Sequence, residues 1–109
     1  MDKLKDVFEF KEDKPVFIAK LEGTTAKKQV KLSQCLLVVF DELYGNDWLE
    51  TSILRQILDD YGIPLTNLAR NLTNQKEIFR KMGQKQATKY KLTGQGKKKA
   101  LELIRELAV

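Results

Sequence analysis

Histidine is absent from this chain of 109 residues, and cysteine occurs once, as Cys35. Without histidine the common zinc ligand sets and the Ser/His or Cys/His nucleophile pairs cannot form, and one cysteine cannot make an intramolecular disulfide. Cys35 stands in the apolar run CLLVVF, which favours a buried thiol over a reactive one. The sequence therefore predicts no enzyme, no metal site and no cofactor.

Long apolar segments are missing as well. No stretch approaches the roughly 20 apolar residues of a membrane span, and the N-terminal MDKLKDVFEF alternates charged and apolar residues, unlike a secretory signal. With 42% hydrophobic and 32% charged residues, the composition is that of a globular domain. We therefore expect a cytoplasmic protein without a membrane partner, associated with the nucleoid if its source is prokaryotic.

A helix that is apolar nearly all round is predicted from about Ala26 to Tyr44. Thr24 or Thr25 can cap its start, and Gly45 suits the left-handed residue after its end. Such a helix must be enclosed on several sides, so we interpret it as the central core helix. Trp48, shortly after it, is interpreted as a core residue rather than a base-stacking platform. The apolar residues of the helix are Val30, Leu32, Leu36, Leu37, Val39, Phe40, Leu43 and Tyr44.

A pair of helices joined by a short turn comes next. Apolar residues at intervals of three and four predict the first helix from about Leu49 to Tyr61. Gly62 can end it in the left-handed conformation, and Pro64 suits the first turn of the second helix, PLTNLARNLTN. Leu65, Leu68, Ala69 and Leu72 of this second helix are expected to face inward and its polar side chains outward.

A hairpin and a last helix complete the chain. Residues 78–81 and 88–92 are predicted as antiparallel strands joined by residues 82–87. Thr93 can cap a final helix that runs to Ala108, although Gly94 and Gly96 weaken its first turn.

The first 25 residues are assigned to an N-terminal extension. VFEF fits a short strand or a frayed extended segment. Asp13 before Lys14-Pro15 is typical of a helix start and Gly23 of a helix end, so a short helix is expected between them. A strand over PVFIAKL is the alternative.

The helix pair ILRQILDDYGIPLTNLARNL and the last strand and helix, YKLTGQGKKKALELI, resemble the winged-helix family of helix-turn-helix domains over residues 26–109. This resemblance implies a mainly α-helical fold with a small β-hairpin wing, a three-helix core and a C-terminal helix. In that family the second helix of the pair enters the major groove of double-stranded DNA, and the wing lies along the backbone or minor groove. The resemblance implies a transcriptional regulator or a DNA-binding accessory protein.

The cations of the chain are concentrated in its second half. Residues 70–99 hold ten lysines and arginines against one acid, Glu77, a net charge of +9; the whole chain is +5, which leaves −4 for the remainder. Such a distribution favours a phosphate-binding surface. The residues predicted to read bases are Thr66, Asn67, Arg70 and Asn71. Those predicted to contact the DNA backbone or form the wing are Gln75, Lys76, Arg80, Lys81, Lys85, Lys89 and Lys91, with Lys97, Lys98 and Lys99 extending the surface.

Two alternatives stay open at this point. A basic run is often only a solvated face, and a winged-helix domain can serve as a protein-interaction module whose basic surface binds an acidic partner. A homodimer formed through the C-terminal or the N-terminal helix is compatible with the apolar stripe of the last helix.

Overall fold

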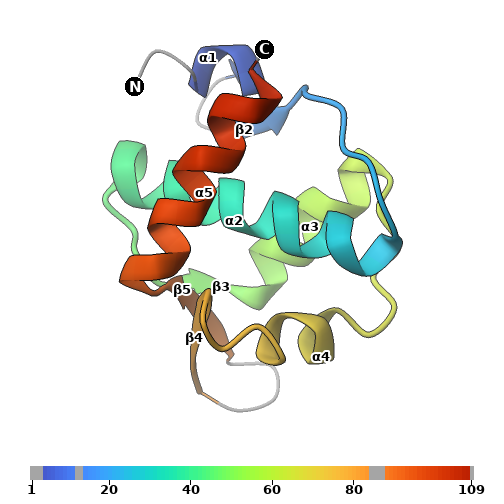
Figure 1. Ribbon diagram of the computed structural model, residues 1–109, viewed down its shortest axis with the longest axis vertical. Coiled ribbons are helices and arrows are strands. Elements are labelled where there is room, and N and C mark those ends of the chain that lie inside the picture. The colour runs from blue at the N-terminus through green and yellow to red at the C-terminus, as the bar shows by residue number, and fades with distance from the viewer. Residues whose placement is uncertain (1–3, 12–13, 84–87, 109) are drawn as a thin grey trace.

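The computed structural model describes residues 4–11, 14–83 and 88–108, and helix α2, Thr25–Tyr44, lies at its centre (Figure 1). The Thr24 hydroxyl accepts a hydrogen bond from the backbone N–H of Lys27 at 3.2 Å, and Gly45 follows the helix in the left-handed conformation, with φ of 64°. Every residue from 32 to 39 is buried. The prediction of an enclosed central helix is confirmed.

The first helix of the pair begins later than predicted. Leu49 and Glu50 form the short strand β3, and helix α3 spans Thr51–Tyr61. Leu49 is fully buried and pairs with Tyr90, so strand pairing with a distant residue overrides its place in the helical pattern. Gly62, with φ of 97°, ends α3 as predicted.

The second helix is shorter than predicted. Helix α4 spans Leu68–Thr73, so the expectation of a helix beginning at Pro64 is wrong. The carbonyl oxygens of Pro64 and Thr66 accept hydrogen bonds from the Gln29 side chain, and Asn67 has a left-handed φ of 59° that interrupts a right-handed helix. Residues 63–67 are therefore an irregular connection held by α2.

A three-stranded antiparallel sheet, in the order β3-β5-β4, follows the helix pair. Strands β4, Phe79–Met82, and β5, Lys89–Leu92, confirm the predicted hairpin to within one residue at each end. Residues 84–87, and with them the predicted contact Lys85, lie outside the described residues.

Helix α5, Gly94–Leu107, confirms the predicted last helix and packs across α2 (Figure 1). The Thr93 hydroxyl caps it by accepting a hydrogen bond from the backbone N–H of Gly96 at 2.9 Å. Ala100 and Ile104 are buried on the side that faces the core.

The N-terminal segment is a small hairpin, not a helix after Asp13. A four-residue helix, α1, Leu4–Val7, leads into strand β1, Phe8–Lys11, which pairs with β2, Lys14–Phe17. The helix expected between Asp13 and Gly23 is thus wrong, and the alternative strand reading is correct in part. Phe8 and Phe17 face each other across the hairpin and are both buried. Burial of these aromatic side chains therefore favours a strand over a helix at Phe17.

The chain as described is a mixed fold that is 56% helical, with two small antiparallel sheets. Its N-terminal hairpin belongs to the same core as the rest, since the Phe17 and Tyr61 rings meet edge to face at 5.2 Å and the Tyr61 hydroxyl donates to the Ala19 carbonyl at 2.7 Å. Within the described ranges, none of the helices combines the length and the apolar character needed to cross a bilayer.

Candidate nucleic-acid interface

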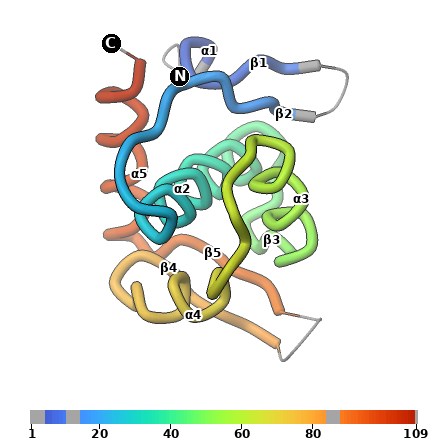
Figure 2. Tube along the Cα trace, turned by 90° about the vertical axis from the view of Figure 1, so that its right-hand side faces the viewer, coloured from blue at the N-terminus to red at the C-terminus, as the bar shows by residue number. Residues whose placement is uncertain are grey.

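Helix α4 and the β4–β5 hairpin lie together at one end of the molecule. Figure 1 shows both at the lower end, and Figure 2, turned by 90°, shows them there again, with the α1–β1–β2 segment at the opposite end. Two views agree, so the segments that the sequence singled out for DNA contact share one side of the fold.

The exposed face of α4 is centred on Arg70. Leu68 and Leu72 are buried, and at 100° per residue Arg70 lies about 180° from their mean direction. Asn74, also exposed, flanks Arg70 on one side, and the half-buried Thr73 flanks it on the other. The exposed face of the helix therefore carries the Arg70 guanidinium between the Asn74 carboxamide and the Thr73 hydroxyl. All three groups can hydrogen-bond to base edges.

The other three predicted base-reading residues are placed differently. Thr66 and Asn67 are exposed but lie in the connection before α4 rather than on the helix. Asn71 is half-buried, and its Nδ2 donates to Oε1 of Gln29 at 2.7 Å. One edge of the Asn71 amide therefore points to α2, away from the exposed face of α4 that carries Arg70.

Gln29 fixes α4 and its connection to the central helix. Its side chain is fully buried, and Nε2 donates to the carbonyl oxygens of Pro64 at 2.7 Å and Thr66 at 3.1 Å while Oε1 accepts from Asn71. A buried carboxamide with both ends satisfied holds its partners in place, because breaking any one bond leaves a desolvated polar group. Sequence reasoning missed this role; the available signal was that Gln29 precedes Leu32 and Leu36 by three and seven residues and so lies on the apolar stripe of the helix.

One face of the hairpin is cationic. The register puts Arg80 directly opposite Lys91 and Met82 opposite Lys89, all on the face that turns away from the buried Tyr90. Glu50 of β3 lies opposite Lys89 on the same face. Arg80 and Lys91 are like charges directly opposite each other, which destabilises a sheet, and Glu50 and Asp47 offset part of this positive charge.

Lys91 already has an anionic neighbour. Its Nζ donates to Oδ2 of Asp47 at 3.1 Å, and this hydrogen bond holds the pKa of Asp47 below its usual value. The same ammonium lies 5.6 Å from the centre of the Trp48 ring. Trp48 is half-buried against this cation, so the prediction that it fills the core is wrong.

Acidic side chains neutralise part of the positive charge at the start of α5. Lys97 Nζ lies 2.7 Å from Oε1 of Glu42 and 3.4 Å from Oδ2 of Asp41, and its hydrogen bond with Glu42 raises the pKa of Lys97. Lys99 Nζ lies 3.7 Å from Oε2 of Glu77. These lysines join α5 to α2 and to the segment before β4.

Among residues 4–11, 14–83 and 88–108, the predicted contact cations that form no ion pair are Arg70, Lys76, Arg80, Lys81, Lys89 and Lys98.

Comparison with protein-family models, with curated proteins and with solved structures finds no match to this chain. What the protein does must therefore follow from its own geometry and charge.

Proposed function

We propose that this protein is a winged-helix DNA-binding protein, in which α4 enters the major groove and the β4–β5 hairpin lies on the backbone or in the minor groove. The observation that supports this most is the shared placement of the Arg70 face and the cationic hairpin at one end of the fold (Figures 1 and 2). The helix pair, the hairpin and the helix after it also follow one another in the order that the resemblance implies.

The dimensions of α4 suit a groove. A helix with its side chains is about 10–12 Å across, which fits the major groove of B-DNA, about 12 Å wide, and the six residues of α4 rise about 9 Å along it. Arg70, at the centre of the exposed face of α4, can donate two parallel hydrogen bonds to guanine O6 and N7. Asn74 beside it can bind adenine N6 and N7. Base contacts of this kind support a sequence-specific role, as in a transcriptional regulator or a DNA-binding accessory protein.

The unpaired cations would supply most of the affinity. Each phosphate contacted by a lysine or arginine releases condensed counterions, so the logarithm of the binding constant falls by about 0.9 per contact for each unit of log salt concentration. Arg80, Lys81 and Lys89 belong to the hairpin, and Lys76 lies between it and α4. Four such contacts would give a slope of about −3.6.

Titration of a random-sequence duplex at several salt concentrations tests the proposal. We expect fluorescence anisotropy to show binding at about 50 mM salt that weakens about 150-fold by about 200 mM, as a slope of about −3.6 implies. A variant with Arg80→Gln, Lys81→Gln and Lys89→Gln should lose most of this affinity and show a shallower slope.

A matched control removes cations from the far end of the molecule. The double variant Lys5→Gln/Arg105→Gln lowers the charge on α1 and on the last turn of α5, which lie away from α4 (Figure 1). Its duplex affinity should stay within about twofold of the parent protein. Absence of duplex binding at the lowest salt concentration would refute DNA binding and favour a module that binds an acidic protein.

A further inference from the structure

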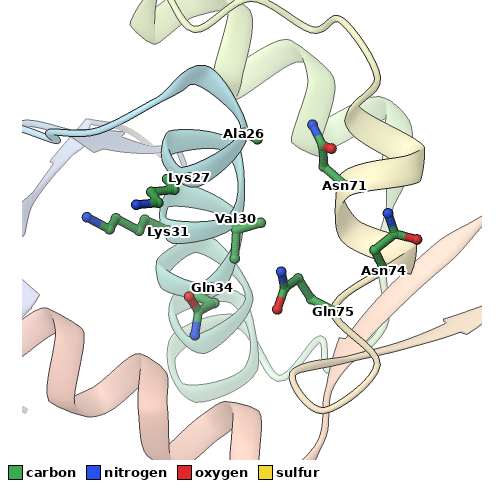
Figure 3. A pocket seen from close by; sticks show the side chains of 8 residues that line it. All are labelled: Ala26, Lys27, Val30, Lys31, Gln34, Asn71, Asn74 and Gln75. Carbon is green, nitrogen blue, oxygen red and sulfur yellow. The ribbon is translucent and has the colours of Figure 1, made fainter.

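The hollow between the first half of α2 and α4 offers few groups to a ligand (Figure 3). It measures about 300 Å³, but the amides of Gln34 and Asn74 and the ammonium groups of Lys27 and Lys31 turn away from it. These are four of its six polar lining side chains. The hollow therefore does not present the converging polar groups that hold a small ligand.

Strand β1, at the opposite end of the molecule, is an open edge. The N-terminal sheet has the order β1-β2, and Figure 2 shows β2 between β1 and α3. The far side of β2 faces α3, whose Tyr61 ring meets Phe17 at 5.2 Å, and Pro15 of β2 has no N–H to donate there. Among the residues that the structure describes, no strand lies beyond β1. Such an edge presents backbone groups that can pair with a strand of another chain.

The register determines which backbone groups of β1 point outward. The N–H of Ile18 donates to the Val7 carbonyl at 2.8 Å, so these two residues form a hydrogen-bonded pair just before the strand. Such pairs alternate with non-hydrogen-bonded pairs along an antiparallel ladder. Glu9 therefore bonds to β2 as Val7 does, whereas the N–H and C=O of Phe10 point away from β2. Phe10 thus offers one donor and one acceptor at the open edge.

The side chain of Phe10 is also incompletely covered. It is 37% exposed, whereas Phe8, two residues earlier on the same face, is 1% exposed. The two rings lie 6.2 Å apart between centroids. An aromatic ring placed beside Phe10 by a further strand would extend this row and remove apolar surface from water.

The residues around Phe10 complement themselves. If two β1 strands run antiparallel with Phe10 opposite Phe10, Glu9 of each copy stands opposite Lys11 of the other. Opposite charges across strands stabilise a sheet, and like charges destabilise it. In the same register the two Phe10 residues exchange both of their outward hydrogen bonds. A register centred on Phe8 would instead place Glu9 opposite Val7, so the backbone pattern and the charge pattern favour one alignment.

We infer that the protein forms a homodimer in which the β1 strands of two copies pair antiparallel about Phe10. The two hairpins then make one four-stranded sheet, with a two-fold axis perpendicular to it between the β1 strands. A second copy fits this edge because an isologous contact requires a surface that complements itself, as residues 9–11 do. The contact uses β1 and not the terminal helices that the sequence suggested for a dimer.

The dimer has a consequence for DNA that rests on the proposed function. Helix α4 and the β4–β5 hairpin lie at the end of the molecule opposite β1 (Figures 1 and 2), so pairing of the β1 strands turns the two DNA surfaces away from each other. Placed end to end, two copies extend over about twice the 35 Å length of one. A dimer that reads a single palindrome needs its two helices about 34 Å apart on one side of the duplex. The β1 dimer would bridge two duplexes instead.

Sedimentation velocity of the full chain without DNA tests the dimer. We expect the mass to rise from that of one chain toward that of two as the protein concentration increases from about 10 µM to about 1 mM. Hydrogen exchange measured by NMR adds a local readout. The Phe10 amide should exchange more slowly as the dimer forms, whereas the Glu9 amide, already bonded to β2, should change little.

Substitutions at the edge test the register. Phe10→Lys places like charges opposite each other at the two-fold axis, so it should weaken dimerisation about tenfold or more. Met82→Lys makes the same change on an exposed side chain of strand β4, at the other end of the molecule, and should dimerise like the parent protein. Glu9→Lys and Lys11→Glu should each weaken dimerisation about fivefold or more, and the double variant Glu9→Lys/Lys11→Glu should restore it.

Three results would overturn the inference. The first is a chain that stays monomeric at about 1 mM. The second is a dimer that Phe10→Lys leaves as tight as before, because such a dimer forms on another surface. The third is a charge-swapped double variant that stays as weak as the two single variants, because the strands would then not pair about Phe10.

A bridging assay separates the dimer from the proposed function. At a protein concentration above the dimer dissociation constant, a bead-bound duplex should retain a second, labelled duplex. Phe10→Lys should bind a single duplex as the parent does and retain at least fivefold less of the second one. Duplex binding without bridging by the parent protein would refute the bridging step. A protein that dimerises but binds no duplex would refute DNA binding and leave the β1 dimer established.

Discussion

At the scale of single residues, Gln29 determines where α4 lies. Its carboxamide connects the central helix to Pro64, Thr66 and Asn71 by three hydrogen bonds of 2.7 to 3.1 Å. The polar pattern of α4 placed Asn71 among the base-reading residues, but pattern alone cannot show that its amide has a partner on another helix. A buried polar contact depends on which helices meet, and periodicity carries no such information.

Replacement of Gln29 tests this connection. Gln29→Leu keeps the size of the side chain but leaves two carbonyl oxygens and the Asn71 amide without their partner, so we expect a loss of about 2–4 kcal/mol in the free energy of unfolding. Urea denaturation measures it. Gln56→Leu, an exposed glutamine on α3, should change stability by less than about 0.5 kcal/mol. Equal stability of the two variants would show that the three bonds contribute little.

At the scale of elements, local signals predicted the central and C-terminal helices well. The hydroxyl groups of Thr24 and Thr93 cap the starts of helices. Gly45 and Gly62, which have no side chain, adopt the left-handed conformation that ends helices. The errors lie where packing between elements decides. Strand β3 forms because Leu49 pairs with Tyr90, far along the chain, a pairing that no short window of sequence contains. Strand β2 forms because Phe17 packs on Phe8 across a hairpin.

The junction between α5 and β4 gives a sharp prediction about packing. A Cβ on Gly96 would lie 2.1 Å from the Ile78 carbonyl oxygen, whereas a Cβ on Gly94 meets nothing within 4 Å. Gly96→Ala must push the first turn of α5 away from β4, and we expect it to destabilise the protein by about 2–3 kcal/mol. Gly94→Ala, in the same helical turn, should be neutral or stabilise by up to about 1 kcal/mol. Thermal unfolding of both proteins checks this, and a stable Gly96→Ala variant would contradict the close approach.

At the scale of the whole molecule, the two ends of the fold differ in structure and in charge. The N-terminal hairpin closes the core with Phe8 and Phe17, while the opposite end presents α4 and the β4–β5 hairpin (Figure 2). The net charge of +9 over residues 70–99 therefore belongs mainly to one side of the molecule. Ion pairs of Lys91, Lys97 and Lys99 reduce this charge. Among the residues that the structure describes, the cations of this region without an ion pair lie on α4, the hairpin strands and the segment between them, with Lys98 on α5.

This arrangement predicts two different losses from two single substitutions. In the proposed complex Arg70, at the centre of the exposed face of α4, contacts a base edge, so Arg70→Ala should narrow the affinity gap between selected and random duplex by about tenfold. In the proposed complex Lys89, on the hairpin, contacts phosphate, so Lys89→Ala should weaken binding to both duplexes alike and reduce the salt slope by about 0.9. Fragments enriched from a random DNA pool supply the selected duplex, and anisotropy measures both affinities. Arg105→Ala, near the C-terminal end of α5, serves as the control and should alter neither. If Arg70→Ala and Lys89→Ala lower the two affinities by the same factor, α4 does not read sequence, and the duplex is held by charge alone.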